Sequence, residues 1–220
     1  MNQLSAPSCC LPQTRREVRR EERRSAILEV ATRYFLEHGY AATTMSEIAA
    51  ALGGSKGTLW NYYASKELLF ADVLERAITE FRNQLSLALN PEEPMRDALL
   101  QFCVRYCERI VKPESVALYR LVMSEVGRFP EVGRIFYERG PRQVHRLLSN
   151  FLGQAMDKGE LRAADPLEAA QFLIALCMGR GHLRLLTGVT QGLSRADARV
   201  EAEGALDMFL RAYAGPATTA

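Results

Sequence analysis

The most constraining stretch of this chain covers residues 43–70 and reads TTMSEIAAALGGSKGTLWNYYASKELLF. Thr44 and Glu47 have the spacing of a capping box, in which the side chain of each residue bonds the backbone N–H of the other. Apolar residues then recur at helical spacing until Gly53-Gly54, which predicts a helix end because glycine readily takes the left-handed backbone conformation. A second short helix and the start of a third follow. Two short helices across a glycine turn are typical of a helix-turn-helix unit.

The second helix of this unit has the kinds of group that DNA recognition needs. We expect Ser55 to cap it, and Leu59 and Tyr63, four residues apart, to share its buried face. The other faces offer a cation, a bare glycine backbone, a hydroxyl, an amide and two rings with N–H or O–H donors. A helix in the major groove presents such groups to base edges and phosphates. Two helices of any small bundle could share these caps and this turn, so the pattern alone leaves a purely structural role open.

The same segment resembles the DNA-binding domain of the TetR family of one-component bacterial transcription regulators, and the AcrR-like branch is the most similar. The resemblance covers about residues 25 to 70 and rests on Phe35, Gly39-Tyr40, Thr43-Thr44-Met45, Ile48-Ala49, Gly54, Ser55-Lys56-Gly57-Thr58-Leu59-Trp60, Tyr62-Tyr63, Ser65-Lys66-Glu67 and Leu69-Phe70. Trp60 departs from the tyrosine more usual in the family, although its indole N–H can still donate to a phosphate. Gly53 also departs, because the family's turn is usually less rich in glycine.

The resemblance implies a ligand-responsive, sequence-specific DNA-binding regulator, which we expect to be a repressor released from a palindromic operator by a small molecule. A twofold homodimer would present two recognition helices to the two half-sites of double-stranded DNA. We expect contacts at or near base edges from Lys56, Thr58 and Asn61, and a close backbone approach at Gly57. The other expected DNA-binding residues are Thr44, Trp60, Tyr62 and Lys66, as phosphate contacts, and Ser55.

Composition narrows the class of protein. The chain has 220 residues and a net charge of only +2, so it must bind DNA through a small patch and not by general charge. It has no run of ~18 apolar residues and no signal-peptide pattern at its N-terminus, so we expect a cytoplasmic protein with no membrane partner. Its five cysteines are odd in number and lack zinc-site spacing, which argues against a disulfide framework. We expect no metal and no other cofactor.

Helical periodicity and the positions of proline and glycine predict an all-α fold. A three-helix helix-turn-helix domain would come first, followed by a larger helical domain for ligand binding and dimerisation. The expected helices cover residues 22–38, 45–52, 56–62, 65–89, 94–110, 114–127, 130–139, 141–157, 166–187 and 195–213. The expected domains are a disordered arm over 1–20, the helix-turn-helix domain over 21–66, the regulatory domain over 67–214 and a disordered tail over 215–220.

A basic stripe precedes the first expected helix. The arginines between Arg15 and Arg24 are spaced so that they fall on one side of a helix, with glutamates beside them. One interpretation is a solvated, partly frayed helical extension. The alternative is an arm that lies against the DNA backbone or the minor groove.

The C-terminal region is rich in large apolar residues. Each of them could be plain core, but as a group in a TetR-like protein they suggest a cavity for a small apolar or aromatic effector. The expected lining residues are Phe81, Phe102, Tyr106, Tyr119, Met123, Phe136, Tyr137, Phe172 and Leu176. The resemblance also implies that the last two long helices form the dimer interface, through Phe172, Ala175, Gly179, Leu183, Leu206, Phe209, Leu210 and Tyr213.

Cys103 and Cys107 share one helical face, and we expect both to pack as small hydrophobic residues. The alternative is a thiol sensor, which would need exposure and a positive neighbour.

Two rival function classes are disfavoured. A helical enzyme would need a set of nucleophile, base and orienting residue or a phosphate loop, and neither occurs; His38, His145 and His182 are scattered. A helical adaptor that does not bind DNA is disfavoured by the intact recognition-helix pattern.

Overall fold

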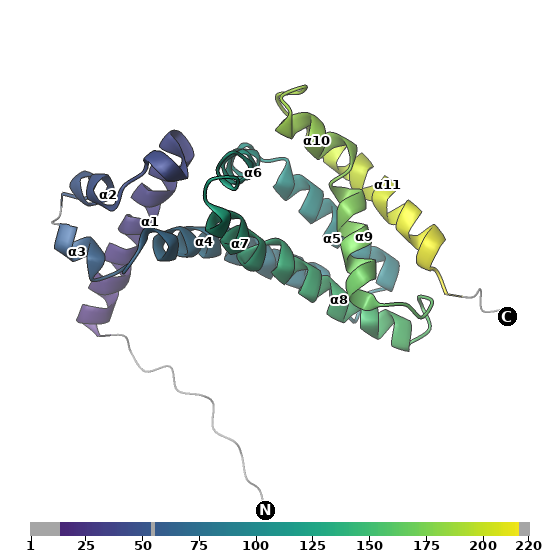
Figure 1. Ribbon diagram of the computed structural model, residues 1–220. Coiled ribbons are helices and arrows are strands. Elements are labelled where there is room, and N and C mark those ends of the chain that lie inside the picture. The colour runs from purple at the N-terminus through teal and green to yellow at the C-terminus, as the bar shows by residue number, and fades with distance from the viewer. Residues whose placement is uncertain (1–13, 54–55, 216–220) are drawn as a thin grey trace, which may run out of the picture.

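The computed structural model describes residues 14–53 and 56–215, and the regular elements in these ranges are helices (Figure 1). They are α1 (Arg15–Ala42), α2 (Met45–Ala51), α3 (Lys56–Trp60), α4 (Lys66–Ala88), α5 (Met95–Ile110), α6 (Pro113–Glu125), α7 (Pro130–Arg139), α8 (Pro141–Asp157), α9 (Pro166–Cys177), α10 (Arg180–Leu186) and α11 (Arg195–Tyr213). The predicted all-α fold is confirmed. None of the helices in the described ranges is long and apolar enough to cross a membrane.

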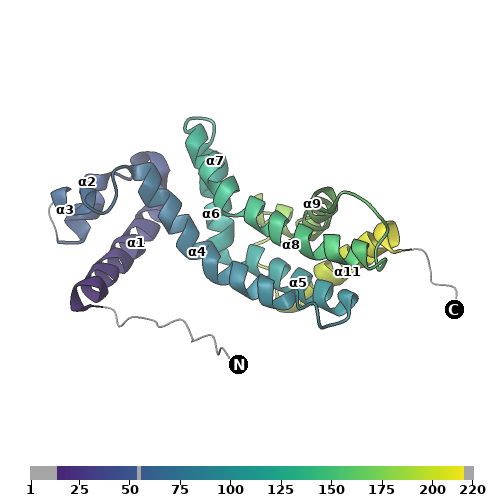
Figure 2. The same cartoon turned by 90° about the horizontal axis from the view of Figure 1, so that it is seen from below.

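The molecule has two hydrophobic cores, and α4 contributes to both. The first, which we call the headpiece core, joins α1, α2, α3 and the N-terminal half of α4 with buried residues of α6 and α7. The second, the regulatory core, joins the C-terminal end of α4 with α5, α8, α9 and α11. Figure 2 shows α4 running from the group of α1–α3 into the larger helical group. This helix is therefore a continuous connection between the two ends of the protein.

The start of α1 differs from the prediction. The helix begins at Arg15, where a capping box between Thr14 and Glu17 supplies bonds to the first turn. Residues 15–20 are thus helical and not part of a disordered arm, because a local cap was overlooked. The expected arm over residues 1–13 and the tail over residues 216–220 lie outside the described residues.

Two other differences from the expected helix bounds exceed two residues. The expected helix over 166–187 is broken into α9 and α10 at Met178-Gly179. A Cβ atom on Gly179 would lie 3.1 Å from the Leu176 carbonyl oxygen, which is a tight contact that glycine avoids. In α1, Gly39 has a φ of 84° and kinks the helix where it was expected to end, and one further turn follows before Thr43.

Candidate DNA interface and effector cavity

The helix-turn-helix unit is built by local bonds. The Thr44 hydroxyl accepts from the Glu47 N–H at 3.2 Å, and the Glu47 carboxylate accepts from the Thr44 N–H at 2.9 Å. The hydrogen bonds from the Thr44 hydroxyl and backbone also lower the pKa of Glu47. Gly53 ends the segment with a φ of 64°, a conformation that favours glycine. The predicted capping box and glycine turn are therefore present.

The exposed side of α3 and of the turn that follows it at residues 61–62 holds several expected DNA-binding residues; α3 ends at Trp60 and not at residue 62 as expected. Leu59 and Tyr63 are buried in the headpiece core, and this fixes which side of the helix faces solvent. Gly57 and Asn61 are exposed, Trp60 is 42% exposed, and Thr58 and Tyr62 are half-buried. Ser55 lies outside the described residues, and the Lys56 side chain is likewise outside them. The structure thus brings the described members of the set to one solvent-facing surface.

Lys66 has an internal role that the sequence did not predict. Its ammonium donates to the Tyr40 carbonyl at 2.7 Å and to the Thr43 carbonyl at 3.2 Å, and it lies 4.2 Å from the centre of the Tyr40 ring. Burial lowers the pKa of Lys66. Two of its three N–H donors therefore satisfy carbonyls at the end of α1. The expected phosphate contact stays a prediction, and one N–H donor of Lys66 remains for it.

An ion pair seats α3 and α1 on α4. The Arg24 guanidinium donates to the Asp72 carboxylate from Nη2 at 2.7 Å and from Nε at 3.1 Å, and the Tyr63 hydroxyl donates to the same carboxylate. Burial, followed by the bond to Asp72, raises the pKa of Tyr63 to about 12. Sequence reasoning placed Arg24 in the basic stripe and missed this cluster, because Asp72 is 48 residues away in sequence. Arg15, Arg16, Arg19 and Arg20 are exposed.

A second connection joins the end of α6 to the kink of α1. The Ala41 N–H donates to the Glu125 carboxylate at 3.0 Å, and the ring of Phe129 lies 5.5 Å from that of Tyr40. A Cβ atom on Gly39 would come within 2.9 Å of the same carboxylate oxygen, so the contact requires glycine there. The C-terminal end of α6 and the residues after it thus contact the end of α1 directly.

Two small cavities share Arg109 as a lining residue. The outer cavity, about 80 Å³, lies between α4, α5, α6 and α7 and is lined by the aromatic residues Phe81, Tyr106, Tyr119 and Phe136. The inner cavity, about 70 Å³, lies between α1, α4 and α6. Both are lined by Ala77, Arg109, Ser115 and Leu118. Four of the nine expected effector residues therefore line one cavity.

The other five expected effector residues lie elsewhere. Phe102 is fully buried in the regulatory core and stacks on Tyr106. Met123 and Tyr137 are exposed on the surface. Phe172 and Leu176 line the groove between α9 and α11. The prediction for these residues is corrected because apolar character alone does not separate core, surface and cavity positions.

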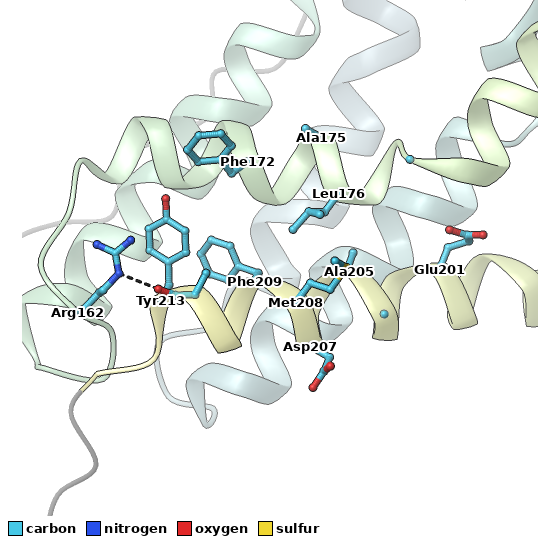
Figure 3. Close-up of a pocket in the computed structure, with 13 residues that line it drawn as sticks. Arg162, Phe172, Ala175, Leu176, Glu201, Ala205, Asp207, Met208, Phe209 and Tyr213 are labelled. Atoms are coloured by element: carbon cyan, nitrogen blue, oxygen red, sulfur yellow. Dashed lines mark hydrogen bonds between the residues drawn. The ribbon is translucent and has the colours of Figure 1, made fainter.

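The groove between α9 and α11 has a volume of about 980 Å³ and is open to solvent (Figure 3). Phe172 is 52% exposed on its α9 side, and Ala175, Gly179 and Leu183 are also exposed on α9 and α10. At one end of the groove the Arg162 guanidinium donates to the Ala212 carbonyl at 2.7 Å and lies over the Tyr213 ring. The expected interface residues Phe172, Ala175, Gly179 and Leu183, on α9, α10 and the break between them, are therefore exposed to a partner.

The α11 side of the groove corrects the predicted dimer interface. Leu206, Phe209 and Tyr213 are buried in the regulatory core, and Leu210 packs against it. The exposed residues of α11 that suit an interface are instead Val200, Gly204 and Met208. Both faces of α11 are apolar, so periodicity alone could not show which one the protein covers with its own helices.

Comparison with known proteins identifies the family. Residues 27–73 match the family model described as bacterial regulatory proteins, tetR family, and residues 97–215 match the model of an AefR-like transcriptional repressor, C-terminal domain. The HTH-type transcriptional regulator YhgD of Bacillus subtilis is 33% identical over 163 residues, which are 70% of this chain and 80% of YhgD. The chain belongs to the TetR family.

Two further relatives support the TetR assignment. The HTH-type transcriptional repressor ComR of Escherichia coli K12 is 28% identical over 160 residues, covering 71% of this chain and 76% of ComR. The solved structure of the flavonoid-responsive regulator FrrA superposes with a TM-score of 0.74 at 33% identity, covering 88% of this chain and 98% of that one. This TetR-family protein is a DNA-binding transcriptional regulator of the repressor type and not an enzyme, as expected from the sequence.

Three cysteines in the described part of this TetR-family regulator lie where thiol chemistry is disfavoured. Cys103, Cys107 and Cys177 are buried, and the Cys107 thiol donates to the Cys177 carbonyl at 3.7 Å. Contact with Cys177 and burial raise the pKa of Cys107. A reactive cysteine needs exposure and a low pKa, so the geometry supports a packing role for these three residues.

Proposed function

We propose that this regulator is a homodimeric repressor whose two α3 helices bind a palindromic operator and whose affinity for the operator falls when a small aromatic effector binds. The observation that carries the DNA-binding role is the α3 surface, where buried Leu59 and Tyr63 leave Gly57, Trp60 and Asn61 facing solvent. The protein would act in the cytoplasm, where the bacterial chromosome lies.

The DNA-binding proposal is tested by a mobility-shift titration of the purified protein against DNA that flanks its own gene. We expect a saturable shift that the same unlabelled fragment competes and bulk DNA does not. Selection from a random DNA pool would find an operator located elsewhere. Failure to enrich any sequence from that pool would contradict the proposal.

Replacing Asn61 by alanine should change which operator sequence is preferred, because an amide bonded to a base edge contributes about 1–3 kcal/mol of discrimination. Replacing Tyr62 by phenylalanine removes only a hydroxyl and should weaken binding to all sequences about equally, as expected of a phosphate contact. Binding constants for the operator and for single-base variants, measured at one salt concentration, check both. An equal loss across all sequences for Asn61→Ala would show that Asn61 does not read bases.

Dimerisation is proposed through the groove between α9 and α11. Exposed apolar side chains from both helices line it, together with small residues that allow helices to approach closely. The proposed interface comprises Phe172, Ala175, Leu176, Gly179, Leu183, Val200, Gly204 and Met208. A twofold pair formed in this way would set the spacing of the two recognition helices.

The effector proposal rests on the aromatic lining of the outer cavity. FrrA, a relative with the same fold, is described as flavonoid-responsive, which is consistent with an aromatic compound. An effector that prefers one arrangement of the two halves would shift the population towards it. A coupling of about 1–3 kcal/mol would weaken operator binding roughly 5- to 150-fold.

Replacing Glu125 by alanine should loosen the contact between α6 and the end of α1. The Ala41 N–H would lose a charged acceptor, and such a bond contributes about 1.5–3 kcal/mol. We expect hydrogen exchange at Ala41 and its neighbours to become roughly 10- to 100-fold faster, as measured by NMR or mass spectrometry. Glu125→Gln is the matched control because it keeps an acceptor oxygen, and it should retain most of the protection. Unchanged exchange in Glu125→Ala would show that this contact does not hold the headpiece.

A further inference from the structure

Arg109 is a cation in the wall between the two cavities. It comes from α5, and its Nη2 donates to the Ala77 carbonyl of α4 at 3.2 Å. Its guanidinium carbon lies 5.9 Å from the centre of the Phe81 ring. Burial lowers the pKa of Arg109, since the charged form loses solvation there. The loss of solvation therefore destabilises the charged form of Arg109, and another group must offset this loss.

Within the described ranges, no carboxylate lies within 4.0 Å of the Arg109 guanidinium. The carboxylate of Glu114, exposed at the start of α6, raises the pKa of Arg109 by its charge from a longer distance. Arg24 and Arg82, which are half-buried like Arg109, pair with Asp72 at 2.7 Å and with Glu75 at 3.1 Å. Arg109 thus loses solvation without a close carboxylate to offset the loss, and ionisable groups perturbed in this way cluster at functional sites.

The groups around Arg109 are donors and rings. The hydroxyls of Tyr106 and Ser115 line the outer cavity and make no hydrogen bond to any residue that the structure describes. The Tyr119 hydroxyl has only a sulfur acceptor, the Met178 Sδ at 3.9 Å. The lining of the outer cavity has several free donors, one cation and no carboxylate, which matches an anion that brings its own acceptor oxygens. The Glu114 carboxylate lines the inner cavity instead. Phe81 and Phe136 would contact a flat apolar body.

We propose that the effector is an aromatic carboxylate whose anionic group pairs with Arg109 while its ring occupies the joined space of the two cavities that Arg109 lines. This inference rests on the proposed function and names the chemical class of its effector. A cavity of ~150 Å³ holds about one benzene ring, so one ring already needs about the combined volume of the two cavities, which are about 80 and 70 Å³. Moving the Arg109 side chain from the Ala77 carbonyl joins them.

The inner cavity gives this site a direct route to the headpiece. Its walls include Thr32, Phe35 and Leu36 of α1, opposite Leu118 and Leu121 of α6. A ligand that enters it separates α1 from α6, on the same pair of helices that the Glu125–Ala41 bond joins. A ligand bound at Arg109 would in this way favour a position of α1–α3, relative to α6, that differs from the ligand-free one, and so weaken operator binding.

The binding test uses the full-length protein and calorimetric titration with benzoate, cinnamate and 2-naphthoate, each compared with its neutral amide. We expect at least one acid to bind with a Kd below about 1 mM and its amide to bind at least about tenfold more weakly, as loss of a charge-assisted bond predicts. Arg109→Met should remove the advantage of the acid, and Arg109→Lys should keep part of it. Equal binding of acid and amide, or no binding of any acid at about 10 mM, would overturn the proposal.

Thermal unfolding of the ligand-free protein separates a ligand-binding role from a structural one. If the role of Arg109 is to bind an anion, Arg109→Met removes an uncompensated charge from the ligand-free protein and leaves its Tm unchanged or raised. If the role of Arg109 is structural, through its hydrogen bond to the Ala77 carbonyl, the Tm of Arg109→Met falls by several degrees and the proposal is wrong. Arg24→Met is the matched control, because it strands the Asp72 carboxylate and should lower Tm.

The two proposals fail in different ways. In the first case, an acid binds, Arg109→Met abolishes this binding, and the acid does not change the operator shift. This result would support the anion site but show that it is not the effector site. An operator shift without any acid binding would keep the repressor and reject the carboxylate.

Discussion

Replacing Phe172 by aspartate should convert the protein from a dimer to a monomer and lower its affinity for the operator by about 100-fold or more. The Phe172 side chain lies in the groove between α9 and α11 and is 52% exposed in the single chain. An aspartate there would lose its hydration inside an apolar interface and leave a charge unpaired. A monomer binds one half-site only, and it loses the gain of ~100- to 10,000-fold that comes from linking two binding events.

Sedimentation velocity gives the oligomeric state, and fluorescence anisotropy at a fixed salt concentration gives the operator affinity. Gly204→Glu is a second probe, because a Cβ atom on Gly204 meets nothing within 4 Å in the single chain. Leu87→Asp is the control: Leu87 is 78% exposed on α4 and lines neither the groove nor a cavity. If Phe172→Asp and Gly204→Glu both remain dimeric, the dimer forms elsewhere.

Replacing Leu69 by alanine should lower the free energy of unfolding by about 2–5 kcal/mol. Leu69 is fully buried in the headpiece core, and the loss is a large part of a typical stability of ~5–15 kcal/mol. The neighbouring Leu68 is 54% exposed on the same helix, so Leu68→Ala makes the same chemical change without leaving a cavity and should cost less than about 1 kcal/mol.

The single tryptophan of the chain makes this measurement specific. Trp60 lies on α3, so its fluorescence reports unfolding of the headpiece, while circular dichroism reports all helices. Both signals should be followed in denaturant at one protein concentration, because dimerisation makes stability depend on concentration. Equal losses in Leu69→Ala and Leu68→Ala would contradict the assignment of Leu69 to the core.

Local patterns in the sequence predicted the features that depend on local contacts. The Thr44–Glu47 capping box, the turn at Gly53 and the buried pair Leu59 and Tyr63 all follow from residues fewer than ten positions apart. Such features are set by backbone geometry and helical spacing. The family resemblance, which covers the same segment, therefore rested on the part of the chain that is easiest to interpret.

The features that were missed depend on distant parts of the chain. The Arg24–Asp72 pair, the Lys66 bonds to α1 and the Glu125–Ala41 bond each join residues more than 20 positions apart. The wrong face was chosen on α11 because Leu206 and Met208 look alike in a sequence, and only the packing of α5 and α9 shows which is covered.

The shared headpiece core limits how this regulator can be recombined with others. Leu121 and Val122 of α6 and Val132, Ile135 and Phe136 of α7 are buried together with residues of α1–α4. A chimera that exchanges only residues 1–66 would place a foreign surface against these side chains. A working sensor built from this headpiece must therefore transplant the α6–α7 segment with it, or redesign those contacts to fit the new partner.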